Sequence, residues 1–298
     1  MIYKPYMRLY SELNGSVFTK EQAQKVLGTS VGASAVVLNR LKKEHAVFQP
    51  ERASYRLMKP ENQVRLAELG WKEKKLRQLV VELYKSYPLL SMLLLYGSRV
   101  RGDADELSDY DVLVVLPVPS ENKSSVKKTI EKKLGIRMHL TVYSEHTYEN
   151  ALMMEPYIRM WLSEGMIFGE GNISRIIIPP APKIAYKEMM YSVETLIEVA
   201  DAERNTGNKG EYYLKALNML LMIGNLLDLD YDYKKTKQKL EGILGQRVIN
   251  SIRHSKKISK EDLNMLKKKT TVEYKKILKK VNAIGENESD IRWRGMLK

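Results

Sequence analysis

The sequence predicts an α+β fold in three parts, and three observations lead to this prediction. Residues 63–180 alternate strand-length apolar runs with amphipathic helical segments. Residues 181–298 show helical periodicity without strand-like runs, and residues 1–62 combine short helices with a hairpin-like stretch. We place the boundaries at 62 and 180 because the joints Lys59-Pro60-Glu61-Asn62 and Pro179-Pro180-Ala181-Pro182 are poor in regular structure.

Composition excludes several classes of protein and site. The 298 residues are 44% hydrophobic, which is enough for packed cores and argues against wholesale disorder. The chain has no Cys, so disulfides, thiolate zinc sites and cysteine nucleophiles are excluded. Four His without ligand spacing argue against a histidine zinc site. No apolar run reaches about 18 residues, and the N-terminus lacks a signal-like apolar region, so we expect a cytoplasmic protein without a membrane partner.

The formal net charge of +14 is unevenly distributed. Residues 71–180 carry 15 basic and 14 acidic side chains, whereas residues 181–298 carry 24 and 16. Between Lys234 and Lys280 there are 16 basic and 4 acidic residues. This stretch is suited to RNA or another polyanion, but a solvated helical face accounts for it equally well.

The first part has the element order of a winged helix-turn-helix. Helices are expected at 5–13, from the Thr19/Gln22 capping-box pair to about Gly28, and at 31–43, followed by a hairpin of 46–48 and 54–57. This order resembles winged-helix regulator domains, which implies a DNA partner and a possible homodimer.

In such a domain the third helix enters the major groove of DNA. We then expect Ser30, Ser34 and Asn39 to face DNA. Basic side chains are expected near phosphates; these are Arg40, Lys42, Lys43, Arg52 and Arg56. The alternative is that the domain only packs against a neighbour or another subunit.

The third part is predicted to be an all-helical bundle. Helices are expected at 184–203, 211–227, 233–244 and 260–281. A broad buried face is expected on the second of them, from Leu214, Leu217, Leu220, Leu221 and Ile223.

The residues that indicate chemistry lie between 93 and 115. A buried strand ends at Gly97-Ser98, where glycine lets backbone N–H groups approach an anion and the serine adds a hydroxyl. Asp109 and Asp111 follow on the next strand, and alternation places both carboxylates on one face. A phosphate cradle beside paired carboxylates is suited to Mg²⁺-nucleotide chemistry.

The stretches GSRVRG and SDYDVLVVLP resemble the signature of the nucleotidyltransferase superfamily related to DNA polymerase β, and especially its minimal or kanamycin-type domains. The resemblance covers about residues 71–171. It implies a mixed sheet with helices. Helices are then expected at 71–86, 124–134 and 145–163, with a strand at 137–143, and the last helix leads to residues 165–169.

The resemblance also implies roles for individual residues. Gly97 and Ser98 would bind the triphosphate, and Asp109 and Asp111 would bind Mg²⁺ or Mn²⁺. Arg99 and Arg101 would contact phosphate. For Arg101 a structural pair with Asp103, Asp105 or Glu106 is the alternative.

The sequence departs from the family pattern on its third strand, which has no carboxylate. His139 occupies the corresponding position, and Thr141 is the other candidate on that face. His139 would then act as a base or ligand, or Glu145 would supply the base. The alternative is a packed histidine in a domain without turnover.

The expected function is transfer of a nucleoside monophosphate from an NTP to a hydroxyl group of a macromolecular acceptor. That acceptor is tRNA, another nucleic acid or a protein, and the C-terminal bundle would close over the nucleotide cleft. The alternative is a DNA-binding transcriptional regulator or toxin–antitoxin component whose nucleotidyltransferase domain only senses nucleotide.

Overall fold

The structure is a computed structural model that describes residues 4–13, 15–106, 108–169, 181–255 and 257–285. It is a mixed α+β chain with two sheets. Two compact units divide it: Met1–Tyr148 with Gly165–Ile176, and Glu149–Glu164 with Ile177–Lys298. The first unit therefore contains both the N-terminal elements and the larger sheet.

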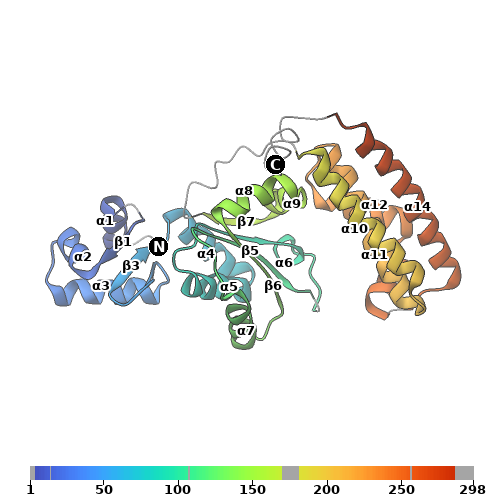
Figure 1. Cartoon of the computed structure of the whole chain (residues 1–298). Coiled ribbons are helices and arrows are strands. Elements are labelled where there is room, and N and C mark those ends of the chain that lie inside the picture. The colour runs from blue at the N-terminus through green and yellow to red at the C-terminus, as the bar shows by residue number, and fades with distance from the viewer. Residues whose placement is uncertain (1–3, 14, 107, 170–180, 256, 286–298) are drawn as a thin grey trace. The chain divides into compact units, whose positions relative to one another are not determined.

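The N-terminal elements are three helices and a three-stranded antiparallel sheet (Figure 1). The helices are α1 (Lys4–Leu13), α2 (Lys20–Leu27) and α3 (Val31–Lys43), and the strands are β1 (Val17–Thr19), β2 (Val47–Phe48) and β3 (Ser54–Leu57), in the order β1-β3-β2. The expected helices and hairpin are confirmed, including the capping box at the start of α2. β1 escaped prediction because three residues are too few to show alternation.

Two expectations for DNA-facing residues are wrong. Ser34 has no exposed surface, and its hydroxyl donates to the Val31 carbonyl at 3.0 Å. The Arg56 guanidinium donates to the carbonyls of Pro88 and Leu90 at 3.2 and 3.1 Å, so it ties the hairpin to the loop before the larger sheet. Ser34 is therefore not available to a nucleic acid, and the half-buried Arg56 guanidinium is already held by two carbonyl groups.

Residues 59–62 do not form an irregular joint. Helix α4 (Pro60–Lys72) begins there, because proline suits the first helical turn, where the missing N–H needs no partner. Asn62 is buried in this helix and donates to the Gly169 carbonyl at 3.1 Å. The helix expected at 71–86 is α5 (Lys74–Ser86), separated from α4 at Glu73.

The larger sheet has four strands in the order β6-β5-β4-β7. These are β4 (Met92–Tyr96), β5 (Tyr110–Leu116), β6 (Met138–Ser144) and β7 (Met166–Gly169). β5 and β6 run parallel, joined through α7 (Lys123–Leu134), while β4 is antiparallel to β5 and β7. The expected mixed sheet with helices is confirmed.

One core layer fills the space between the sheet and helices α5 and α7. Its central members are Leu79, Val80, Leu83, Leu93, Leu95, Val112, Val114 and Ile130. Because side chains alternate along a strand, the neighbours of Val112 and Val114 point to the other face. Asp111 therefore lies on the face opposite this core.

The helix expected at 145–163 is two helices. α8 (Glu145–Met154) and α9 (Tyr157–Glu164) are separated at Glu155-Pro156. Proline lacks the N–H that helix continuation needs, and its ring disfavours helical geometry at the residue before it.

In the second unit every described element after residue 182 is helical. These are α10 (Lys183–Ala202), α11 (Thr206–Leu227), α12 (Tyr233–Leu244), α13 (Gln246–Asn250), the π-helix η2 (Ser251–Ser255) and α14 (Lys260–Ala283). The buried face expected on α11 is confirmed, since Leu217, Leu220 and Ile223 have no exposed surface. No described helix is long and apolar enough to cross a membrane.

Candidate active site

The turn after β4 is built around Gly97. Its backbone has φ 78° and ψ −168°, a conformation open essentially only to glycine. A Cβ atom at this position would lie 2.1 Å from Oδ2 of Asp111. Glycine is therefore needed twice, for the backbone angle and for the close approach to this carboxylate.

The two aspartates lie at the beginning of β5. Asp109 directly precedes the strand and Asp111 is its second residue, so alternation places both on one face. Asp111 pairs with Tyr96 of β4, which brings it to the end of β4 where the Gly97 turn starts. Burial raises the pKa of Asp111; nearby His139 opposes this rise, and Asp109 adds to it.

Strand β6 brings two nitrogen-bearing side chains opposite these carboxylates. Tyr110 pairs with Met138 and Asp111 with His139 in the parallel register. Nδ1 of His139 lies 3.7 Å from Oδ1 of Asp111, and Nε of Arg137 lies 3.0 Å from Oδ1 of Asp109.

Arg137 was missed by sequence reasoning. The available signal was spacing: Arg137 and His139 are two residues apart, as are Asp109 and Asp111. Only the parallel register of β5 and β6 turns these two spacings into two facing pairs.

The arginines after Gly97 brace the loop that leads to Asp109. The Arg99 guanidinium donates to the Ser108 carbonyl at 3.0 and 3.3 Å and lies 4.8 Å from the centre of the Tyr110 ring. Arg101 pairs with Asp103 at 3.4 Å, which agrees with the structural alternative for this residue. Ser98 begins the short helix α6 (Ser98–Arg101), which ends at Gly102.

Glu145 does not supply the base expected as an alternative. It follows the last residue of β6, whereas His139 is near the first, so about 20 Å of strand separates the two positions. Its carboxylate accepts a hydrogen bond from Ser91, at the far end of β4. Thr141 is two residues along β6 from His139 and pairs with Leu113.

The donor set fits a magnesium ion bound together with a nucleotide. Mg²⁺ is commonly held by one or two carboxylates, substrate phosphates and water. Asp109 and Asp111 provide two such carboxylates. Among the described residues, no three Asp, Glu, His or Cys side chains form a group able to hold a metal. Two carboxylates alone would leave part of the coordination of such an ion to phosphate oxygens and water.

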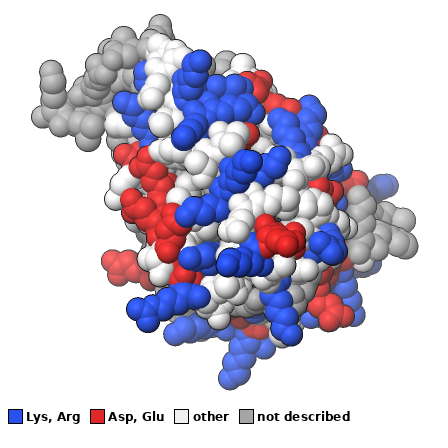
Figure 2. All heavy atoms as spheres, turned by 90° about the vertical axis from the view of Figure 1, so that its right-hand side faces the viewer, with Lys and Arg blue, Asp and Glu red and all other residues white. Residues whose placement is uncertain are grey.

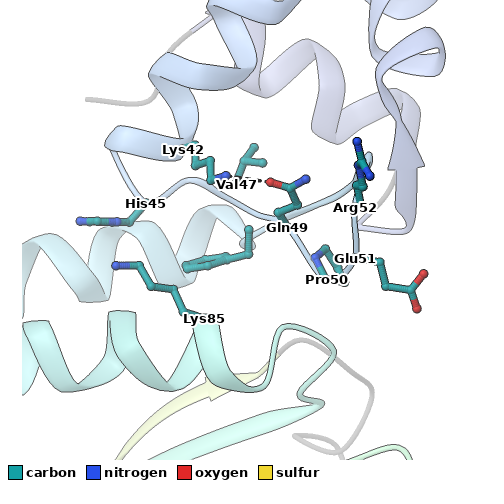
Figure 3. A pocket seen from close by; sticks show the side chains of 9 residues that line it. Lys42, His45, Val47, Gln49, Pro50, Glu51, Arg52 and Lys85 are labelled. Atoms are coloured by element: carbon teal, nitrogen blue, oxygen red, sulfur yellow. Dashed lines mark hydrogen bonds between the residues drawn. The ribbon is translucent and has the colours of Figure 1, made fainter. Parts of the chain in front are cut away.

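Hollows lie in the described part of the first unit. One, of about 510 Å³, borders the site and is lined partly by Arg99, Ser108 and Arg137. Another, of about 430 Å³, lies among α3, the β2–β3 hairpin and α5. In Figure 3 its Glu51 and Arg52 point away from His45 and Lys85, so its charged side chains do not converge on one point.

Comparison with known proteins identifies the domain that carries this site. Residues 73–159 match the family described as "Nucleotidyltransferase domain". No curated protein gives a match. One similar solved structure is the spectinomycin adenyltransferase AAD(9) from Enterococcus faecialis with ATP and spectinomycin. It is 15% identical to this chain, and the superposition has a TM-score of 0.44. The match covers 68% of this chain and 98% of that one. Residues 73–159 are thus similar to nucleotidyltransferase domains, and the Gly97 turn, Asp109 and Asp111 all lie within this stretch.

Proposed function

We propose that this protein is a Mg²⁺- or Mn²⁺-dependent nucleotidyltransferase that moves a nucleoside monophosphate from an NTP to a hydroxyl group of a macromolecule. One observation carries the proposal: the Gly97 backbone approaches Asp111 so closely that no side chain fits between them. A phosphate held by that turn would lie beside the two carboxylates. The family match of residues 73–159 supports the reaction class.

In this proposal the residues divide the work by their chemistry. Gly97 and Ser98 bind the triphosphate through backbone N–H groups and a hydroxyl. Asp109 and Asp111 hold the metal ion, which when bound neutralises charge on the phosphate oxygens. Arg99 and Arg101 act on the phosphates indirectly, by fixing the loop between the turn and Asp109.

The transfer itself exchanges one bond to phosphorus for another. The acceptor oxygen forms a bond to the α-phosphorus, the bond to the oxygen bridging to the β-phosphate breaks, and pyrophosphate leaves with that electron pair. The hydroxyl proton passes to a base, and we propose His139 for this role. Its imidazole lies beside Asp111 and its side chain is 62% exposed, within reach of an incoming hydroxyl.

We propose a nucleic acid such as tRNA, or a protein, as the acceptor. The C-terminal helices favour a polyanion, because α14 exposes Lys268, Lys275 and Lys279 along its length. Figure 2 shows Lys and Arg side chains spread over the face that carries α12 and α14, with acidic side chains among them. We infer that this helical part contacts the acceptor.

A label-transfer assay tests the proposed activity. The purified full chain is incubated with each α-labelled NTP, with Mg²⁺ or Mn²⁺, and with tRNA, total RNA or cell extract. The expected result is label on a macromolecule that disappears in the Asp109→Ala/Asp111→Ala variant. A reduced transfer rate with unchanged nucleotide affinity in His139→Ala would support the role of this residue as base.

No label under any condition would contradict the proposed activity. Label that persists in the double variant would show that another site performs the transfer. Metal-dependent NTP binding without transfer would instead favour the second candidate function.

The second candidate is a nucleotide-sensing DNA-binding regulator, or a toxin–antitoxin component, in which residues 1–62 form a winged helix-turn-helix. The supporting observation is that α3 exposes Asn39, Arg40 and Lys43, while the hairpin turn exposes Arg52. We propose that this form is a cytoplasmic homodimer. Fluorescence anisotropy would test it, with salt-dependent DNA binding that changes on NTP addition as the expected result. A nucleotide response that survives Asp109→Ala would count against it.

A further inference from the structure

The β6 side of the site places a permanent cation, Arg137, beside a carboxylate that is expected to hold a metal ion. Asp111 pairs with His139 in the parallel register of β5 and β6, and Asp109 and Arg137 each lie two residues earlier in the chain. The guanidinium of Arg137 is 3.0 Å from the carboxylate of Asp109. Arginine stays protonated at every physiological pH, so this carboxylate is neutralised in the free protein.

The set of protein ligands, rather than the total charge, argues against two divalent ions at this site, because a bound triphosphate adds negative charge of its own. Asp109, Asp111 and Arg137 together carry a formal charge of −1. Among the described residues no third acidic side chain completes a metal-binding group. Two divalent ions would have to share two carboxylates, one of which is paired with a guanidinium in the free protein.

Arg137 is also able to change partners at little cost. Its side chain is 67% exposed and that of Asp109 is 48% exposed, and an ion pair between such exposed groups contributes about 0.2–1 kcal/mol. A guanidinium presents a planar set of donors that matches phosphate oxygens, and its contacts with phosphate are stronger than those of a neutral donor.

We propose that Arg137 is the built-in counter-cation of this site and takes the place of a second metal ion. In the free protein it neutralises Asp109. When a nucleotide binds with one divalent ion, the guanidinium moves from Asp109 to a phosphate oxygen. Arg137 is therefore a positioning residue for the triphosphate, and the inference rests on the proposed nucleotide site.

Manganese titration of the full chain, followed by electron paramagnetic resonance of free Mn²⁺, tests this inference. It is performed with and without the α,β-methylene analogues of ATP, GTP, CTP and UTP. The variants are Arg137→Ala and the conservative Arg137→Lys. Lys127→Ala is the control, because it removes an exposed ion pair with Glu131 on α7.

The wild-type chain should bind one Mn²⁺ with the preferred analogue. Arg137→Ala should bind Mn²⁺ alone about two- to fivefold more tightly, because a competing cation is gone. The same variant should bind the analogue about tenfold or more weakly, because a charged contact to phosphate is lost. In Arg137→Lys both changes in affinity should be smaller than in Arg137→Ala, and in Lys127→Ala neither affinity should change.

These opposite directions separate a counter-cation from a merely structural arginine, whose loss would weaken both affinities. Two Mn²⁺ per wild-type chain, or an Arg137→Ala variant in which both affinities fall or stay unchanged, would overturn the inference while leaving the nucleotide site standing. A wild-type chain that binds no analogue with Mn²⁺ would overturn the proposed function as well.

Discussion

Replacing Gly97 by alanine is the most informative single change in this protein. The added methyl group meets two obstacles, the backbone angle and the Asp111 carboxylate. Gly97 has φ 78° with an extended ψ of −168°, and its Cβ would lie 2.1 Å from Oδ2 of Asp111. Gly102, five residues later, has a similar φ of 81°, yet a Cβ there meets nothing within 4 Å. Comparison of Gly97→Ala with Gly102→Ala therefore separates the effect of backbone strain from the effect of contact with Asp111.

The structure sets the size of both effects. Strain at a backbone conformation reserved for glycine costs about 1–3 kcal/mol. Real Cβ contacts are essentially never under 3.0 Å, so the carboxylate must retreat by about 0.9 Å from its place at 2.1 Å. The same carboxylate is proposed to hold the metal ion, so this displacement weakens the coordination on which metal-dependent nucleotide binding relies. Gly97→Ala should therefore lose stability and most metal-dependent nucleotide binding, whereas Gly102→Ala should lose about 1 kcal/mol of stability only.

Two measurements on the same samples check this prediction. Urea denaturation gives the free energy of unfolding, and calorimetric titration with an NTP analogue and Mg²⁺ gives the nucleotide affinity. Gly97→Ala with wild-type nucleotide affinity would refute the argument that this turn and Asp111 form one site. An equal loss of affinity in Gly102→Ala would attribute the effect to the loop as a whole.

Three further predictions concern stability. Burial and the nearby Lys85 and Arg77 lower the pKa of His45. Just below the ordinary pKa of 6.5 the unfolded state therefore binds more protons than the folded state, and the free energy of unfolding decreases as the pH is lowered. His45→Asn, which tolerates the φ of 60°, should remove that slope in urea denaturation between pH 7.5 and 5.5, and an unchanged slope would contradict this. Arg56→Ala should lower the free energy of unfolding by about 2–3 kcal/mol, because it removes the guanidinium that donates to two carbonyl groups. Replacement of the exposed Arg52 by alanine should change this free energy by less than about 0.5 kcal/mol. Equal effects of the two substitutions would be evidence that Arg56 does not brace the hairpin. Asn62→Ala leaves the Gly169 carbonyl without this donor and should cost about 1–3 kcal/mol by thermal unfolding, so a variant as stable as wild type would count against it.

Local signals in the sequence predicted much of this fold. The bounds predicted for α3 (Val31–Lys43) and α12 (Tyr233–Leu244) agree with the structure, in which Ser30 and Asp232 cap these helices. Gly97 was identified because it ends a buried strand and lets backbone N–H groups approach an anion. Asp109 and Asp111 were placed together by strand alternation alone. Each of these inferences depends on neighbours within a few residues.

The predictions that failed depended on contacts between distant segments. Ser34 lies on the buried side of α3, and packing against other segments decides which side of this helix is buried. Arg56 is held by carbonyls more than thirty residues away. Arg137 could be paired with Asp109 only once the β5–β6 register was known.

Metal-dependent nucleotide binding tests the central claim most directly. An NTP analogue that cannot be cleaved is titrated into the wild-type chain and into Asp109→Asn/Asp111→Asn, with Mg²⁺ and with chelator. We predict saturable binding to the wild-type chain that requires Mg²⁺ and is lost in the variant. Binding that is independent of Mg²⁺, or that is as strong in the variant as in the wild-type chain, would contradict the assignment of these carboxylates.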